Sequence, residues 1–181
     1  CLVIGSPLQE VLALKLNGWD VTYLDIRTPP ASFGKHICCD AMNMPEMSFD
    51  AVSSTCVLCH AGTGRYGDAI DINGDQRVLR GIARVLRPGG KAAITFGCVA
   101  DIPNMIRIGM LHRIYNITEV KRMILDAGLT LKDSRIWGWR TKGWVDNPQK
   151  PEQVNDTWQL ELGQMDYIST FCTKDVAAGN P

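Results

Sequence analysis

Short apolar runs separated by helical segments are the feature that most constrains the fold of this chain. Residues 1–4 form the first run, and Gly5 ends it before an apolar stripe with helical spacing begins. Apolar runs of this length are typical of strands that are covered on both faces. Strands that alternate with helices predict an α/β fold around a parallel sheet. The runs expected to form the parallel strands are 1–4, 21–24, 36–39, 49–55 and 91–96.

Helix-start signals lie between the runs. Ser6 and Gln9 form a capping box, in which each side chain satisfies a backbone N–H at the start of a helix. Asp75 is expected to cap a second helix, and Thr118 a third helix that ends before Gly128. The first two helices connect predicted strands, as the crossovers of a parallel sheet require.

The composition fits one folded domain. The 181 residues are 45% hydrophobic and 21% charged, which is ordinary for a globular protein, so a single domain over 1–181 is expected. No apolar run approaches the ~20 residues that a membrane-spanning helix needs. Nineteen basic side chains balance nineteen acidic ones, and this neutrality disfavours nucleic acid as a partner.

The cysteines and the first residue bear on where the chain works. The seven cysteines are scattered and odd in number, which suits a reduced thiol pool, so a cytoplasmic location is expected. The chain begins at Cys1 without an initiator methionine, and residues 1–4 already have the pattern of a buried strand. An upstream N-terminal segment is therefore expected.

Glycine and acidic residues follow the predicted strands directly. Gly5, Asp25 and Asp40 end the first three runs, and the fourth run ends near Ser54. Ligands in parallel sheets bind outside the carboxyl ends of the strands, so these residues are expected to line one crevice. There a glycine lets the backbone approach a ligand, and an acid can accept a hydrogen bond from a ribose hydroxyl. Only the first glycine of a G-x-G-x-x-G fingerprint is present, so an ordinary turn with a solvated acid stays an open alternative.

Motifs along most of the chain strengthen the ligand-binding interpretation. In order they are VIGS (3–6), YLD (23–25), CDAMNMP (39–45), FDAV (49–52), VLCHAG (57–62), VLRPGGKAAITF (85–96) and DYISTFCTKD (166–175). With this order and spacing, the chain resembles the class I S-adenosylmethionine-dependent methyltransferases. The segments GRYGDAIDINGD (64–75) and HRIY (112–115) resemble a group within that superfamily known as DUF268.

The resemblance implies a Rossmann-like class I methyltransferase fold. Its sheet has seven mostly parallel strands, and the last strand runs antiparallel to the rest. Residues 130–139 and 166–173 are then expected to form an antiparallel pair. A final strand parallel to all its neighbours would instead favour a dehydrogenase.

The resemblance also implies S-adenosylmethionine as the cofactor and assigns a pocket to it. The turn after the first run would pass along the methionine part, and the acid that ends the second run would hold the ribose hydroxyls. The corner after the third run would bracket the adenine, and the end of the fourth run would line the floor beneath the sulfonium. In that order the residues are Gly5 and Ser6; Asp25 and Ile26; Asp40, Ala41 and Met42; and Thr55, Cys56 and Leu58. The chain departs from the family at 6–8, where many relatives have further glycines.

Methyl transfer needs little covalent chemistry from the protein. The sulfonium already activates the methyl group, so in-line positioning supplies most of the acceleration. A base helps when the acceptor is a hydroxyl or a protonated amine, and His60 is the first candidate because it follows the fourth strand and titrates near neutral pH. Weaker candidates, from two loops expected beside the acceptor, are Asp68, Tyr66, His112 and Tyr115. A purely structural His60 stays an equal alternative.

Two patterns that resemble metal sites are set aside. Cys56-x-x-Cys59-His60 spells a haem-attachment motif, but its first cysteine continues an apolar strand. His36, Cys38 and Cys39 could bind zinc, but the third strand is expected at the sheet edge, far from the fourth. No metal is therefore expected.

Three functions remain, in this order of preference. The first is S-adenosylmethionine-dependent methyl transfer to a small-molecule or glycan-linked acceptor. The second is a methyltransferase-like domain that binds or assembles without catalysing, which the glycine-poor turn at 6–8 would suit. The third is an NAD-dependent oxidoreductase. The sequence does not indicate an oligomeric state.

Overall fold

The computed structural model describes residues 1–5, 8–28, 34–100, 106–108, 112–140, 143–146 and 166–176. In chain order the elements are β1 (Leu2–Ile4), α1 (Leu8–Leu16), β2 (Thr22–Asp25), β3 (Lys35–Cys38), the short helix η1 (Ala41–Asn43), β4 (Phe49–Thr55), α2 (Gly74–Val85), β5 (Leu86–Ala100), β6 (Ile106–Ile108), β7 (His112–Asn116), α3 (Ile117–Asp126), β8 (Thr130–Arg140), β9 (Gly143–Asp146) and β10 (Asp166–Thr173). Ser6 and Pro7, and with them the predicted capping box, lie outside the described residues.

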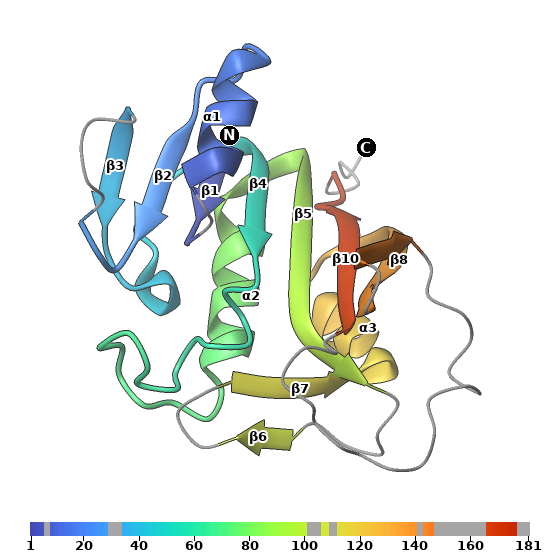
Figure 1. The fold of residues 1–181 in the computed structure, drawn as a ribbon. Helices are drawn as coiled ribbons and strands as arrows, with labels where there is room; N and C mark the ends of the chain where they lie inside the picture. The colour runs from blue at the N-terminus through green and yellow to red at the C-terminus, as the bar shows by residue number, and fades with distance from the viewer. Residues whose placement is uncertain are drawn as a thin grey trace, which may run out of the picture.

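One mixed sheet organises these elements (Figure 1). Its strand order is β3-β2-β1-β4-β5-β10-β8-β9, and β7, which pairs with β6, joins the end of β5. β1 pairs parallel with β2 and with β4, and further parallel pairs join β2 to β3 and β4 to β5. β10 runs antiparallel to both of its neighbours, β5 and β8. The expected α/β sheet with an antiparallel last strand is confirmed.

The side chains of β1 show how the two faces of the sheet are covered. Successive side chains of a strand point to opposite faces. Leu2 and Ile4 belong to the larger hydrophobic core, which includes residues of α2 and α3, whereas Val3 packs with Val11 of α1. α1 therefore covers one face, and α2 and α3 cover the other. Among the described residues, none of the helices has the length and apolar character needed to cross a membrane.

The carboxyl ends of β1, β2 and β4 lie next to one another. Ile4 pairs with Leu24 of β2 and with Ser54 of β4. Because the three strands are parallel, the residues that follow them emerge at one edge of the sheet. The segment that connects β4 to α2 passes below these strand ends in the view of Figure 1. The fold thus gathers the turn residues that the sequence pattern singled out.

Two helix caps differ from the prediction. Asp75, the predicted cap of α2, is instead buried within the helix, and its carboxylate lies 3.0 Å from the Tyr115 hydroxyl. The cap of α3 is Asn116 rather than Thr118, because Asn116 Oδ1 accepts a hydrogen bond from the Thr118 N–H at 2.7 Å. The sequence pattern locates both helices. It does not indicate which of the neighbouring polar side chains hydrogen-bonds to the backbone at the helix start.

Strand β5 is longer than the predicted 91–96, and β6, β7 and β9 were not predicted. The glycine-rich stop ends α2 at Val85, and the chain then continues extended from Leu86. Gly89 has a φ of +78°, and its N–H donates to the Lys174 carbonyl at 2.8 Å. This segment therefore serves both as the end of the helix and as the beginning of the strand.

Candidate functional site

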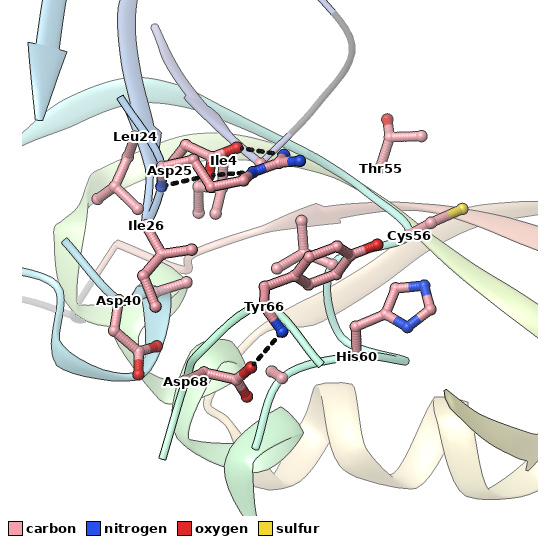
Figure 2. Close-up of a pocket in the computed structure, with 15 residues that line it drawn as sticks. Ile4, Leu24, Asp25, Ile26, Asp40, Thr55, Cys56, His60, Tyr66 and Asp68 are labelled. Atoms are coloured by element: carbon pink, nitrogen blue, oxygen red, sulfur yellow. Dashed lines mark hydrogen bonds and ion pairs between the residues drawn. The ribbon is translucent and has the colours of Figure 1, made fainter. Parts of the chain in front are cut away.

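A cavity of about 430 Å³ opens where β1, β2 and β4 end (Figure 2). This size suits a small molecule, since ligand pockets enclose about 300–1,000 Å³. The walls come from the three strand ends, from the corner before η1 and from the segment between β4 and α2. The lining residues are Ile4, Gly5, Leu24, Asp25, Ile26, Arg27, Asp40, Ala41, Thr55, Cys56, Val57, His60, Ala61, Tyr66 and Asp68.

Most of the predicted site residues line this one cavity. They are Gly5, Asp25, Ile26, Asp40, Ala41, Thr55, Cys56, His60, Tyr66 and Asp68. Ser6 lies outside the described residues. Met42, Leu58 and Tyr115 are buried in the core, and His112 contacts His60 without lining the cavity.

Gly5 forms the tightest corner of the cavity. Its φ is +56°, in the left-handed region that favours glycine, and its N–H donates to the Leu24 carbonyl at 2.8 Å. A Cβ at this position would stand only 2.8 Å from Val57 Cγ2. The absence of a side chain therefore keeps the backbone of the β1 turn accessible beside the β4 end.

Asp25 is the most heavily hydrogen-bonded group of the site. Its Oδ1 accepts from the Arg27 backbone N–H at 2.8 Å and from Arg27 Nε at 3.0 Å. Its Oδ2 accepts from Arg27 Nη2 at 2.8 Å and from the Tyr23 hydroxyl at 2.7 Å. Burial alone would raise the pKa of Asp25, but the hydrogen bonds from Arg27 and Tyr23 outweigh it, and the pKa is lowered. The carboxylate is therefore ionised at neutral pH.

Asp40 closes the adjacent wall at the corner before η1. Its Oδ1 accepts from the Met42 N–H at 2.8 Å and so caps η1. Asp40 and Ala41 line the cavity, but the Met42 side chain points into the core and is 7% exposed. Of the predicted adenine corner, the structure therefore places Asp40 and Ala41 on the cavity wall and the Met42 side chain in the core.

The end of β4 forms the floor with a strained backbone. Cys56 has a φ of 58°, which is uncommon for a residue other than glycine, and such strain clusters at functional sites. The Cys56 N–H donates to Thr95 of β5 at 2.9 Å, and the Cys59 thiol donates to the Cys56 carbonyl at 2.9 Å. Leu58, predicted to join this floor, is fully buried in the core because the chain turns inward after Val57. Of the residues predicted for the floor, Thr55 and Cys56 line the cavity and Leu58 does not.

Three rings form a row beside the floor. His60 meets Tyr66 edge-on at 5.6 Å between ring centroids, and it meets His112 edge-on at 6.0 Å. Burial, with a smaller contribution from the Arg65 charge, lowers the pKa of His112, so its imidazole is neutral at neutral pH. Figure 2 shows Tyr66 between Asp25 and His60. Asp68 accepts from the Tyr66 N–H at 3.2 Å and so fixes the turn that carries this ring.

Tyr115, which the sequence offers as a catalytic candidate, does not line the cavity. It is fully buried, and its hydroxyl lies 3.0 Å from both the Leu58 carbonyl oxygen and Asp75 Oδ2. Burial and the Asp75 charge raise the pKa of Tyr115. Tyr115 and His112 also lie on strand β7 rather than in a loop.

Sequence reasoning missed Arg113, a fully buried cation next to the site. Its guanidinium donates to carbonyls of the segment between β4 and α2, and these belong to Leu58 (3.3 Å), Ala61, Asp71 (3.0 Å) and Ile72 (3.4 Å). Its Nε lies 3.7 Å from Asp75 Oδ2. Arg113 therefore holds the segment that carries His60, Tyr66 and Asp68. The available signal was a charge inside the apolar run at 112–115.

Arg27 was missed as well, because nothing in the YLD motif marks the residue two positions after its acid. Its guanidinium carbon lies 5.2 Å from the Tyr66 ring centroid, and that of Arg65 lies 5.5 Å from the same centroid. Arg27 thus connects the cavity wall at the end of β2 to the wall formed by the segment between β4 and α2, which carries Tyr66. Across the described residues, no group of three or more His, Cys, Asp or Glu side chains is arranged to hold a metal ion.

Comparison with known proteins shows that the sequence of residues 5–94 matches a family described as a methyltransferase domain. The solved structure of 1,6-didemethyltoxoflavin-N1-methyltransferase from Burkholderia thailandensis, with bound 1,6-didemethyltoxoflavin and S-adenosylhomocysteine, has a TM-score of 0.64 at 18% identity, covering 96% of this chain and 71% of that chain. Geranyl diphosphate C-methyltransferase from Streptomyces coelicolor, in complex with Mg²⁺, geranyl diphosphate and S-adenosylhomocysteine, has a TM-score of 0.63 at 14% identity, covering 96% and 70%.

The same fold also occurs in a protein named for another reaction. The [4+2]-cyclase SpnF has a TM-score of 0.66 at 17% identity, covering 97% of this chain and 74% of that chain. At such identities the solved structures establish the fold alone. No curated protein sequence matches the chain.

Proposed function

Because residues 5–94 match a methyltransferase domain family, we propose that the cavity binds S-adenosylmethionine and that the protein methylates a small-molecule or glycan-linked acceptor. The observation that carries the proposal is the convergence of Gly5, Asp25 and Asp40 on one cavity. They follow three successive strands, and each is the residue type that its position needs. A glycine permits close approach, and carboxylates accept hydrogen bonds from hydroxyl and amine groups.

The cavity fits this cofactor in shape and in chemistry. A Cβ at position 5 would fill the corner between the β1 turn and Val57, so the bare backbone leaves a cradle there. The apolar lining contributed by Leu24, Ile26 and Ala41 suits a purine ring between the two acidic corners.

We assign the parts of the donor to residues of the chain as follows. Gly5 and Ser6 lie along the methionine part, and Asp25 accepts the ribose hydroxyls beside Ile26. Asp40 and Ala41 bracket the adenine, and Thr55 and Cys56 form the floor at the reacting end. The Thr55 side chain is held by its hydroxyl, which donates to Glu10 Oε2 of α1 at 3.1 Å.

The protein's share of the reaction is positioning and proton transfer. Bound S-adenosylmethionine supplies a methyl group already activated by a sulfonium, so holding the acceptor in line supplies most of the acceleration. We propose His60 as the base that takes the proton of a hydroxyl or amine acceptor, because its ring stands at the cavity wall next to Tyr66. Asp68 and His112 would then hold the surrounding turn and ring.

Two finer assignments complete the proposal. We place the chain in the DUF268 group on the segments 64–75 and 112–115, which here supply the Tyr66 turn and the β7 strand. We also propose a cytoplasmic location. The six cysteines whose side chains the structure describes carry free thiols, and a reducing compartment maintains thiols in this state.

Calorimetric titration tests the donor assignment. We expect S-adenosylmethionine and S-adenosylhomocysteine to bind at one site and NAD to show no binding. A screen of sugars, glycosides and small carboxylic acids, read out as S-adenosylhomocysteine release, then identifies the acceptor. A protein that binds NAD and neither of the other two would refute the proposal.

Binding without catalysis is a second candidate, and one contact favours it. The carboxylate of Asp25 already accepts four hydrogen bonds, so the ribose of S-adenosylmethionine must compete with these partners for it. If the protein binds S-adenosylmethionine but transfers its methyl group to no compound in the screen, binding without catalysis is supported. A dehydrogenase is disfavoured, because β10 is antiparallel to both neighbours.

A further inference from the structure

We propose that the methyl acceptor carries an anionic group, a carboxylate or a phosphate, and that Arg27 binds it once the donor ribose has displaced Arg27 from Asp25. This inference rests on the proposed function, since it takes Asp25 as the ribose-binding acid. It adds the chemical class of the acceptor and the order in which the two ligands engage.

The starting point is that Asp25 has no acceptor position left for a ribose. A carboxylate offers about four lone-pair positions, two on each oxygen. Oδ1 accepts two N–H groups of Arg27, and Oδ2 accepts one N–H of Arg27 and the Tyr23 hydroxyl. The two side-chain bonds from Arg27 are the ones that a side-chain rotation can remove. A ribose that binds Asp25 must therefore displace the Arg27 guanidinium.

The displaced guanidinium has a second place to rest at the mouth of the cavity. Arg27 is 61% exposed, so its side chain can move without disturbing the core. Its guanidinium carbon already lies 5.2 Å from the centroid of the Tyr66 ring, within the range of a cation–π contact. Release from Asp25 therefore leaves the cation above Tyr66, on the side of the cavity that holds His60.

The released cation would lack its counter-charge. In the structure Asp25 neutralises Arg27 through a 2.8 Å ion pair, and the ribose hydroxyls that replace Arg27 carry no charge of their own. Arg65 adds a second guanidinium at 5.5 Å from the same ring centroid. Arginine forks bind carboxylates and phosphates in two-point contacts, so the rim of the donor-loaded cavity favours an anionic acceptor.

Two measurable consequences follow from this exchange. Removal of the Arg27 side chain should strengthen donor binding, because the ribose no longer competes with an ion pair. An anion that binds the released Arg27 should also strengthen donor binding, because coupling between two sites is reciprocal. An inert surface arginine would show neither effect.

The experiment titrates S-adenosylhomocysteine into the wild type, Arg27→Gln and the control Arg122→Gln, an exposed arginine of α3, at one ionic strength in chloride, acetate or inorganic phosphate. In chloride we expect Arg27→Gln to bind roughly two- to fivefold more tightly than the wild type, and Arg122→Gln to match the wild type. In the wild type we expect phosphate or acetate to tighten binding by about twofold or more. The more effective anion identifies the acceptor group as phosphate or carboxylate.

The outcomes separate this inference from the proposed function. Equal or weaker donor binding by Arg27→Gln would overturn the competition for Asp25. An anion effect of the same size in the wild type and in Arg27→Gln would overturn the anion site. Binding by Arg27→Gln but not by the wild type would support the inference in its strongest form. Failure of all three proteins to bind would refute the donor assignment itself.

Discussion

At the scale of single residues, Asp25 and Gly5 were predictable and their partners were not. A glycine and an acid directly after apolar runs are visible in the sequence, and parallel pairing places them together. Arg27 and Arg113 were missed because their roles depend on where the folded chain places other backbone groups. Leu58 was assigned to the floor for the same reason, since the direction of a turn cannot be read from residue types.

Asp25→Ala should weaken donor binding about ten- to a hundredfold. The substitution leaves polar groups of the ligand without partners, at about 1–3 kcal/mol. Calorimetry with S-adenosylhomocysteine measures the loss. Asp50→Ala is the matched control, because Asp50 is an exposed acid at the start of β4. Unchanged affinity in folded Asp25→Ala protein would remove Asp25 from the donor site.

His60→Gln should lower turnover about 10²–10⁴-fold and leave donor affinity nearly unchanged, because a general base acts on the acceptor. The pH–rate profile should lose the limb that belongs to the general base. His36→Gln is the control, since His36 stacks on Tyr23 and does not line the cavity. Full activity in His60→Gln would show that positioning alone drives the transfer.

At the scale of elements, the sequence pattern located strands and helices better than their connections. The runs that became β1 and β2 were the clearest signals, because both faces of those strands are covered and their residues are buried throughout. β7 escaped prediction because it carries Arg113, whose charge interrupts the apolar pattern although the residue is fully buried. The neighbouring Asn116 caps α3 through a contact that only the folded turn reveals.

Gly5→Ala should lower the free energy of unfolding and also abolish most donor binding. The left-handed φ disfavours a side chain by about 1–2 kcal/mol, and the added Cβ would press on Val57. Gly18→Ala separates the two effects, because Gly18 has a φ of +84° with no atom within 4 Å of an added Cβ. Chemical denaturation and calorimetry should show similar backbone strain in both variants and a binding defect in Gly5→Ala alone. Equal donor affinities would contradict the close-approach role.

Arg113→Met should lower the free energy of unfolding by about 3–5 kcal/mol, because it leaves the buried Asp75 without its cation and several carbonyls without donors. Urea denaturation measures the loss. The matched change Arg122→Met, on the exposed side of α3, should cost less than about 1 kcal/mol. In Arg113→Lys we expect faster amide exchange over residues 58–72. Similar losses from Arg113→Met and Arg122→Met would contradict the role of Arg113.

At the scale of the whole molecule, the order of the strands was predictable through the resemblance and not through residue patterns. Alternating strands and helices indicate a parallel sheet. They do not reveal that the last strand inserts antiparallel between β5 and β8, because either direction would bury the same apolar face. The position of the cavity could be predicted because the strands whose ends form it lie in the parallel half of the sheet.

The stability of the whole protein should depend on pH through Asp25. The pKa of Asp25 is lowered in the folded state, so its contribution is present above the ordinary carboxyl pKa near 3.9 and is lost as the pH falls through the folded-state value. Arg27→Gln should reduce this contribution by less than about 1 kcal/mol, because Arg27 is largely exposed. Denaturation from pH 7 to pH 3 should show the two proteins converging at the acidic end. A constant difference across that range would show that the effect of the substitution does not come from this ion pair.

The insertion of β10 between β5 and β8 has a consequence for synthesis on the ribosome. The described residues that line the cavity all precede β5 in the chain, yet the Thr170 hydroxyl of β10 donates to the Ile94 carbonyl of β5 from 76 positions away. At about 5–20 residues per second, that gap lasts roughly 4–15 s. During this interval the outer side of β5 is an open edge, able to template pairing with another nascent chain. β10 therefore closes the edge of β5 that would otherwise be open to neighbouring chains on the polysome.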